Sequence, residues 1–419
     1  MAKTTPATLA GRVIEEIRGK VDDYDGGMGA FMQSIREYDD LFRVKKPARR
    51  ANTFSNPRLT EFSRATIALG TLMYRMMTAK DPFFTTIPMD FMGNPFDPMG
   101  GMINYERGQT VQHAMMAQLR AAKYRQQLLK ANMYCLPFGT VFCQEDYRVI
   151  GVNSRGRRIP VTDFIPRVMD QVAFDRGTER IDDADWVSTM DVASNATLQR
   201  LIAEVELVNA PWNKAALQEA IDLNEKSNTI NPYVLTRLQR SGISDTDAIS
   251  RRKELLMYYG KLDCLNDGLE YVCALINRKI LVRFHANNFQ HGKRPFRVAK
   301  WIDWAGPLGI GLGQGIGGLH KSMDANRQKV QDNVAFAAYN IWKRKKGTIS
   351  DDDLAIRPFG FIDVDDHNDI TALNPSTQGA EAGLKLEDLM KQEIRAWSGA
   401  TDTLQAIVTD ATASEVAIA

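Results

Sequence analysis

The sequence predicts a mixed α+β fold, because helical and strand patterns occupy separate blocks of the chain. Apolar residues recur at helical spacing over residues 105–134 and 316–342. Between these segments, short alternating stretches are separated by turns such as Asn266-Asp267-Gly268, which is typical of antiparallel strands. Apolar residues make up 44% and charged residues 25% of the 419 residues, so the composition is globular and excludes disorder for the bulk of the chain.

Residues 1–55 are predicted to form a peripheral N-terminal arm. A short amphipathic helix is expected at 9–24, and Asp25-Gly26-Gly27 ends it. A basic strip follows, made of Arg43, Lys45, Lys46, Arg49 and Arg50. We interpret this strip as a solvated surface; anchoring to an acidic partner is the alternative.

Two helices are predicted next. Asn56 can cap a helix whose first position is Pro57, and Asp81-Pro82 ends that helix. Prolines and glycines in residues 83–102 predict an extended loop. A second long helix is then expected over 105–134.

Strands dominate the middle of the chain. Two strands at 147–152 and 157–161 flank a turn at 153–156, which predicts a hairpin. Short helices are expected within 194–241. A meander follows, with strands predicted at 255–264, 269–276 and 280–285.

A long helix is predicted after the glycine-rich segment 306–318. Its apolar residues fall on one narrow stripe: Ile316, Leu319, Met323, Val330, Val334, Ala337 and Ile341. Such a narrow seam is typical of a helix that packs against a few neighbouring helices. The helix is expected to end in the basic run 343–346, where positive charge is favoured by the helix dipole.

The C-terminal part is predicted to hold a small polar module and a second helix. Residues 348–378 are Asp-rich and contain strand-like pieces at 359–364 and 370–373. A helix over 380–397 follows, and Ser398-Gly399 closes it. Thr412 and Glu415 form a capping box close to Ala419, so we expect the natural protein to continue beyond this residue.

Motifs for nucleotide binding and metal binding are weak, so we expect neither an enzyme nor a bound cofactor or metal. Gly313, Gly315 and Gly318 fit G-x-G-x-x-G, but Ala338 stands where a dinucleotide site needs an acidic residue. A hinge or a close helix approach explains these glycines better. The acidic run 363–369 lacks the glycine and glutamate of an EF-hand, and the five histidines lack zinc spacing.

Charge and hydropathy exclude further classes. The net charge is only +2, so any contact with DNA must be local or weak. No apolar run is long enough to span a membrane, and residues 1–16 lack the apolar region of a signal peptide. Four cysteines without C-x-x-C spacing predict reduced thiols.

Two segments resemble the portal proteins, or head-to-tail connectors, of short-tailed double-stranded DNA bacteriophages. Residues 280–340 carry the first match, which reads ILVRFHANNFQHGKRPFRVAKWIDWAGPLGIGLGQGIGGLHKSMDANRQKVQDNVAFAAYN. Here a strand and an Arg-Pro-Phe turn lead through glycines into a helix with Leu319 and Asn326 at the family's L-x-x-x-x-x-x-N positions. Residues 410–416, DATASEV, are similar to the family's TATEV motif.

The resemblance implies a ring, usually of twelve identical subunits, at one vertex of the capsid. Its channel would admit DNA pumped by terminase, retain it and later release it, without hydrolysing anything itself. The virion, and the host cytoplasm during assembly, are the expected locations. The implied partners are double-stranded DNA, the terminase large subunit, major capsid and scaffolding proteins, and a head–tail adaptor, with no membrane.

The resemblance also implies an order of domains. A wing at 56–313, with both helices and strands, would follow the arm 1–55. The remaining parts are then a first stem helix at 314–342, a clip at 343–378, a second stem helix at 379–398, a tunnel loop at 399–411 and the start of a long wing helix at 412–419.

Three groups of residues are expected to carry this function. The tunnel loop would face DNA through Thr401, Asp402, Gln405 and Thr409. The clip would contact terminase and adaptor through Lys343, Arg344, Lys345, Lys346, Asp363, Asp365 and Asp366. The stem helices would pack between subunits through Ile316, Leu319, Met323, Val330, Val334, Ile341, Leu389 and Trp397. The alternatives are another ring or adaptor protein of the head–tail junction, and a nucleotide-binding protein.

Overall fold

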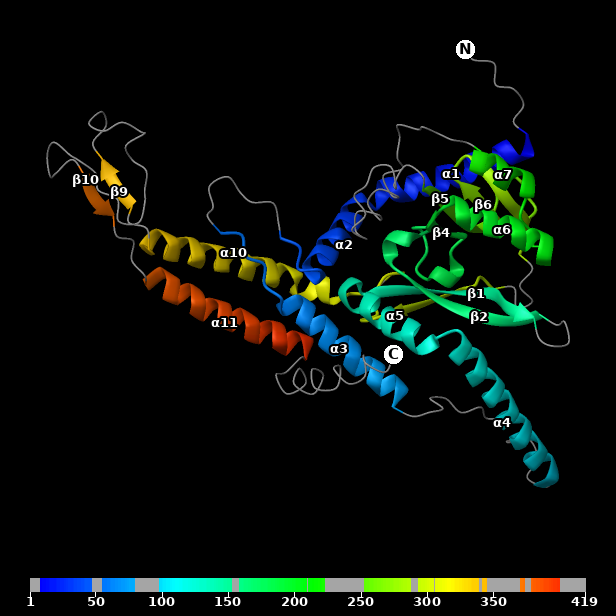
Figure 1. The fold of residues 1–419 in the computed structure, drawn as a ribbon, viewed down its shortest axis with the longest axis horizontal. Coiled ribbons are helices and arrows are strands. Elements are labelled where there is room, and N and C mark those ends of the chain that lie inside the picture. The colour runs from blue at the N-terminus through cyan, green and yellow to red at the C-terminus, as the bar shows by residue number, and fades with distance from the viewer. Residues whose placement is uncertain are drawn as a thin grey trace, which may run out of the picture. The chain divides into compact units, whose positions relative to one another are not determined.

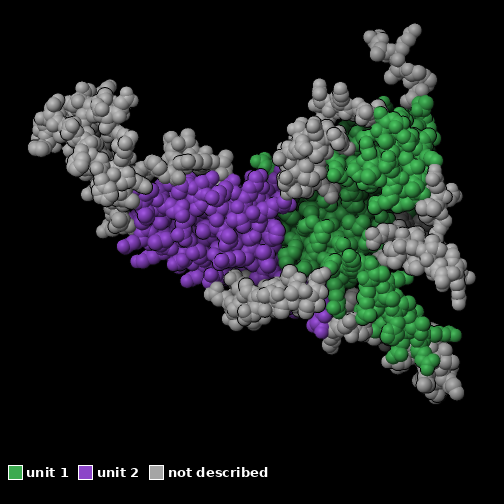
Figure 2. All heavy atoms as spheres, viewed as in Figure 1, with its two compact units in different colours: residues 1–35, 80–310 green, residues 36–79, 311–419 purple. Residues whose placement is uncertain are grey.

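The structure is a computed structural model, and it confirms the mixed α+β class (Figure 1). It describes residues 8–46, 55–79, 98–152, 158–208, 210–222, 252–287, 293–304, 306–338, 341–344, 370–373 and 378–399. The chain divides into two compact units, shown in Figure 2. Unit 1 comprises residues 1–35 and 80–310, and unit 2 comprises residues 36–79 and 311–419. No helix among the described residues has the length and apolarity needed to cross a lipid bilayer.

A five-stranded antiparallel sheet forms the centre of unit 1. Its strand order is β3-β4-β5-β6-β7, and the strands are β3 (Val172–Phe174), β4 (Trp186–Ala193), β5 (Lys253–Lys261), β6 (Glu270–Ile276) and β7 (Ile280–Ala286). The last three strands are the predicted meander. Asn277 and Arg278 join β6 to β7 with left-handed backbone angles, φ 51° and φ 57°, which a tight hairpin turn requires.

A second, three-stranded sheet in unit 1 contains the predicted hairpin. Its order is β2-β1-β8, with β1 at Thr140–Val152, β2 at Arg158–Arg167 and β8 at Phe296–Lys300. β1 and β2 extend well beyond the predicted 147–152 and 157–161. The residues that join them, 153–157, lie outside the described part. Short 3-10 turns at Met169–Gln171 and Ile181–Asp183 flank β3.

The N-terminal helix α1 (Leu9–Gly27) is part of the core of unit 1, and not of a peripheral arm as expected for 1–55. Its apolar side is fully buried through Val13, Ile17, Val21 and Tyr24. The Tyr24 ring lies 5.3 Å from Phe174 and 6.4 Å from Trp186, measured between ring centroids. The amphipathic pattern was therefore identified correctly, but it covers a sheet formed by strands much later in the chain.

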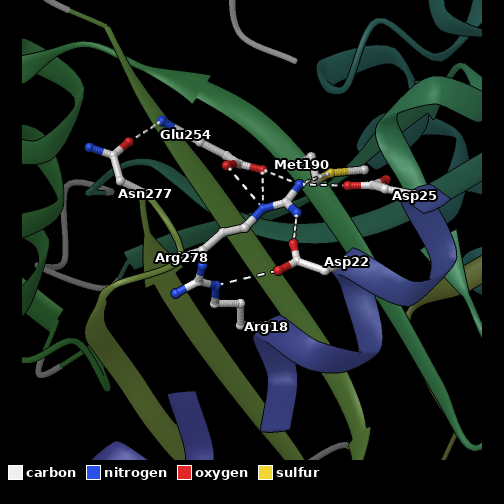
Figure 3. Close-up of polar contacts among 7 residues, drawn as sticks. All are labelled: Arg18, Asp22, Asp25, Met190, Glu254, Asn277 and Arg278. Atoms are coloured by element: carbon white, nitrogen blue, oxygen red, sulfur yellow. Dashed lines mark hydrogen bonds and ion pairs between the residues drawn. The ribbon is translucent and has the colours of Figure 1, made fainter. Parts of the chain in front are cut away.

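Ion pairs fix α1 along its length. Figure 3 shows Arg278, from the β6–β7 turn, between the buried carboxylate of Glu254 and two carboxylates of α1. Its guanidinium nitrogens lie 3.1 Å from Glu254, 2.5 Å from Asp22 and 3.0 Å from Asp25. Earlier on α1, Glu16 accepts hydrogen bonds from the backbone N–H groups of residues 263 and 264. These contacts explain why α1 is held on the sheet.

Three predicted helices differ in their limits. α3 (Glu61–Thr78) begins later than Pro57, and the predicted helix 105–134 is two helices, α4 (Pro98–Ala121) and α5 (Tyr124–Phe138). The break falls at Lys123, whose φ of 53° is left-handed. Ser194 caps α6 (Asn195–Val208) through the Thr197 N–H, as its position predicts.

Asn213 caps the short helix α7 (Lys214–Asp222) in unit 1 by accepting from two backbone N–H groups at its start. The helix α2 (Gly29–Phe42) follows α1 in the chain. Within α2 and just after it, Arg43 pairs with Asp39 and Lys45 with Asp40, so part of the basic strip is neutralised locally. Arg49 and Arg50 lie outside the described residues.

Unit 2 contains the two long helices predicted near the C-terminus. α10 spans Leu312–Ala338 and α11 spans Gln378–Ser398, close to the predicted 314–342 and 379–398. Between them in the chain, the short strands β9 (Ile341–Arg344) and β10 (Ile370–Leu373) pair antiparallel. Residue 341 therefore belongs to a strand and not to the first helix.

Candidate functional site: the helices of unit 2

α10 and α11 lie side by side and antiparallel, and two glycines permit their close approach (Figure 1). Near one end of the pair, Gly315 of α10 faces the ring of Trp397, and a side chain at this position would overlap that ring. Towards the other end, Gly383 of α11 faces Val330 with the same consequence. Glycine is therefore needed at both crossing points because there is no room for a Cβ atom.

Polar contacts add to this packing. The Asn326 Nδ2 group donates to the carbonyl oxygen of Gly383 at 2.6 Å. The fully buried Glu387 carboxylate pairs with Arg327 and, at 2.8 Å, with Lys391. Burial alone would raise the pKa of Glu387, but hydrogen bonds from Lys391 and Arg327 outweigh it, so the pKa is lowered. The carboxylate therefore remains charged and acts as a fixed link between the helices.

The polar side of α10, which the sequence predicts to face away from the apolar stripe, also has partners. Asp324 accepts from the backbone N–H of Leu59 at 2.9 Å and from Arg58 at 2.8 Å. Asp332 accepts from the backbone N–H and the hydroxyl of Ser55 at 2.9 and 2.7 Å. The segment before α3 is thus bound to α10 through its backbone N–H groups, and α3 starts at Glu61 and not at Pro57.

His320 lies at the centre of this arrangement. Its side chain is fully buried, with the ring 6.2 Å from that of Phe62 and Nε2 3.8 Å from the Asp324 carboxylate. Neither ring nitrogen has a hydrogen-bond partner among the described residues. Burial lowers the pKa of His320 below its usual value, although the charge of Asp324 acts in the opposite direction. A proton on His320 would therefore place an unfavourable charge between α3 and α10.

The residues predicted to pack the stem helices of neighbouring subunits together fall into two groups. Ile316, Met323 and Val330 are buried within unit 2 and Leu319 is half-buried, so most of the narrow stripe is already covered within one chain. Exposed residues form the second group: Val334 is 52%, Leu389 62% and Trp397 44% exposed. The side chain of Ile341 lies outside the described part.

One further residue joins the exposed group. Leu386 of α11 is 44% exposed and lies on the same side of this helix as Leu389 and Trp397 by helical geometry. The spacing of 386, 389 and 397 predicted an apolar side, but not that this side faces solvent in one chain. We call these three residues the α11 apolar strip.

Most predicted clip and tunnel residues lie outside the described part. Lys343 and Arg344 are in β9, where they pair with Thr371 and Ile370 of β10. The other predicted residues are not among those that the structure describes. They are Lys345, Lys346, Asp363, Asp365 and Asp366 of the clip, and Thr401, Asp402, Gln405 and Thr409 of the tunnel loop. The roles of these residues therefore stay predictions.

The nucleotide-binding alternative has no support from the geometry. Gly313, Gly315 and Gly318 lie inside α10, so no strand-to-helix loop is present there to cradle a phosphate. The preceding strand β8 is paired antiparallel, unlike a βαβ unit. Within the described ranges, no group of three or more His, Cys, Asp or Glu side chains could hold a metal ion.

Comparison with known proteins gives no family: no protein-family model and no curated protein matches this chain. The interpretation of the helices must come from their own chemistry. Their buried polar groups link the helices, and large apolar side chains are exposed beside charged ones such as Asp388.

Proposed function

We propose that this chain is the subunit of a phage portal ring, located at one vertex of the capsid and in the host cytoplasm before assembly. Its channel would pass double-stranded DNA. Its partners would be further copies of itself, terminase, major capsid and scaffolding proteins, and a head–tail adaptor. The proposal assigns no catalytic residue and no cofactor to the chain.

The observation that carries the proposal is the order of elements in unit 2. A long helix, a small pair of strands and a second long helix follow the strand-rich unit 1, in the order of the stem, clip and stem implied by the resemblance. The two residues at the L-x-x-x-x-x-x-N positions of the resemblance both lie on α10. Leu319 is half-buried, and Asn326 bonds the backbone of α11.

The α11 apolar strip supports assembly into a ring. Leu386 and Leu389 are too exposed to contribute much stability to a single chain, and Trp397 is still 44% exposed although its ring packs on Gly315. In a head-to-tail contact between identical subunits, the strip of each subunit packs against a different surface of the next subunit. Such contacts close into a ring when the rotation from one subunit to the next divides a full turn evenly. Burial of these side chains would then stabilise the ring.

The test is the native mass and electron microscopy of the protein, with one variant in the strip and one control. Leu389→Asp places a charge in the strip and is expected to abolish rings. Leu384→Asp is the control, because Leu384 is 42% exposed on the same helix but is rotated by about 140° from Leu389. A monomeric wild type in the presence of scaffold and capsid proteins would refute the portal proposal.

A second experiment separates the portal from another ring protein of the head–tail junction. Capsids assembled without the portal cannot take up DNA, whereas capsids without an adaptor can be filled but lose their contents. Filled capsids in the absence of this protein would therefore favour the adaptor and contradict the portal proposal.

A further inference from the structure

Arg283 of β7 has an unusual environment in unit 1. Its guanidinium carbon lies 5.1 Å from the centroid of the Trp212 ring, which is a cation–π contact. Its Nε group donates to Nε2 of His285 at 2.8 Å. The other ring nitrogen of His285, Nδ1, lies 2.6 Å from the carbonyl oxygen of Ala286, so it carries the proton and the imidazole is neutral. Among the described residues, Nε is the only side-chain nitrogen of Arg283 that has a hydrogen-bond acceptor, so its two terminal nitrogens can donate to a ligand.

Other largely buried arginines of this protein have a carboxylate partner. The guanidinium nitrogens of these arginines lie 2.7 to 3.1 Å from a carboxylate oxygen in four pairs: Arg58 with Asp324, Arg167 with Asp191, Arg278 with Glu254 and Arg294 with Glu270. Figure 3 shows the arrangement for Arg278. Among the described residues, no carboxylate lies within ion-pair distance of Arg283.

The missing partner has an energetic consequence. Burial removes part of the hydration of the Arg283 guanidinium without supplying a counter-ion, and it accordingly lowers the pKa of Arg283. A cation–π contact contributes about 0.5–2 kcal/mol, which offsets only part of such a loss. The preformed contacts with Trp212 and His285 hold the guanidinium in one orientation, which is the condition for binding a planar ligand through two parallel hydrogen bonds.

We propose that Arg283, stacked on Trp212 and oriented by His285, forms a binding site for a carboxylate. The site is independent of the portal proposal and would remain if that proposal failed. The carboxylate would accept two hydrogen bonds from the terminal nitrogens of Arg283, as Asp191 does from the terminal nitrogens of Arg167.

The neighbouring charges favour a carboxylate over a phosphate. The negative charge of Asp146 acts on Arg283 from beyond ion-pair distance and raises its pKa, as the buried Tyr259 hydroxyl also does. An incoming anion is repelled by Asp146 in proportion to its own charge. A carboxylate with one negative charge is therefore accepted more readily than a phosphate group with nearly two.

The experiment uses protein with ¹⁵N-labelled tryptophan and follows the indole N–H signal of Trp212, assigned with Trp212→Phe. Sodium acetate is titrated against sodium chloride at equal ionic strength. The wild type should show a saturable acetate-dependent shift that Arg283→Met loses. Arg297→Met is the matched control, because Arg297 is also a strand arginine of unit 1 but is 53% exposed, and this variant should keep the shift.

Each outcome decides the proposal. A shift with chloride equal to that with acetate, a shift that survives in Arg283→Met, or no saturable shift would overturn it. A response to inorganic phosphate but not to acetate would overturn the carboxylate assignment. A short acidic peptide that saturates the site at lower concentration than acetate would identify a protein side chain as the source, and equal concentrations would identify a free carboxylate.

Folding of Arg283→Met is not expected to limit the experiment. The substitution removes a buried charge that has no partner and keeps the apolar stem, so it should leave the urea midpoint unchanged or raised. A midpoint lowered further than the loss of the contacts with Trp212 and His285 accounts for would show that a carboxylate of this chain already pairs with Arg283, and this result would also overturn the proposal.

Discussion

Replacement of Arg278 by methionine should destabilise unit 1 strongly. The substitution leaves the Glu254 carboxylate, which is fully buried, without its cation (Figure 3). Removal of one partner from a buried ion pair costs about 3–5 kcal/mol, because the remaining charge is buried and uncompensated. Asp22 and Asp25 are 48% and 42% exposed in their side chains, so water compensates them and their lost pairs add little.

The free energy of unfolding is measured by urea titration, followed by circular dichroism and tryptophan fluorescence. Arg18→Met is the control, because Arg18 pairs with the same Asp22 but is 60% exposed. Its loss should lie within about 0.5 kcal/mol, as is usual for surface substitutions. The double variant Arg278→Met with Glu254→Met should recover much of the loss, because it removes both charges together.

The backbone of Arg278 offers an internal check on this magnitude. Its φ of 57° is left-handed, a conformation that costs most residues about 1–2 kcal/mol but costs glycine very little. Arg278→Gly should therefore lose about 1–2 kcal/mol less than Arg278→Met. If Arg278→Met is no more damaging than Arg18→Met, Glu254 does not depend on Arg278 and the reasoning is wrong.

Three further predictions follow from unit 2 and from α1. The wild type should lose stability as pH falls below 6.5, because the folded state lowers the pKa of His320 and the unfolded state therefore binds more protons. His320→Phe should remove this loss. Urea midpoints measured at several pH values test this, and a variant whose midpoint falls with pH as steeply as that of the wild type would contradict it. Gly383→Val should cost about 1–3 kcal/mol by overpacking against Val330, measured in the same titration, and a neutral effect would refute the close approach. Glu16→Gln should weaken the loss of stability that occurs as pH falls from 4.5 to 2. Burial alone would raise the pKa of Glu16, but hydrogen bonds from Lys20 and from backbone N–H groups lower it to about 2, so the folded state is stabilised while Glu16 is charged. A pH profile of the variant identical to that of the wild type would contradict this stabilisation by the Glu16 carboxylate.

The fold could be predicted where the signals are local. The strands of the meander and the helix that starts at residue 195 were predicted, and the Asn277-Arg278 turn and the Ser194 cap that delimit them depend only on residues close by in the sequence. The break at Lys123 was missed because the apolar spacing continues across it, and only the φ of 53° reveals it. Helical spacing also shows that α1 has an apolar side, but not which strands that side will cover.

The candidate site follows the same division. The long helices and the narrow stripe of α10 were predictable from spacing, since helical periodicity is a local property. The role of Asp324 was not predictable, because its partners Arg58 and Leu59 lie far away in the sequence and the spacing of α10 alone places it on a polar side. Glycine density suggested a close approach, whereas the opposing Trp397 could be identified only from the structure.

The two arginines of the β6–β7 hairpin show why burial alone does not determine the effect of removing a charge. Both guanidinium groups are largely shielded from water, but Arg278 is surrounded by carboxylates, whereas Arg283 meets an aromatic ring and a neutral imidazole. Removal of Arg278 takes a cation away from the buried Glu254 carboxylate, while removal of Arg283 eliminates a buried cation that has no counter-ion among the described residues. The same substitution, arginine to methionine, should therefore lower the urea midpoint at one position and leave or raise it at the other. A common response at both positions would mean that side-chain packing, and not charge pairing, determines the stability of this sheet, and the assignment of Arg283 to a ligand would lose its physical basis.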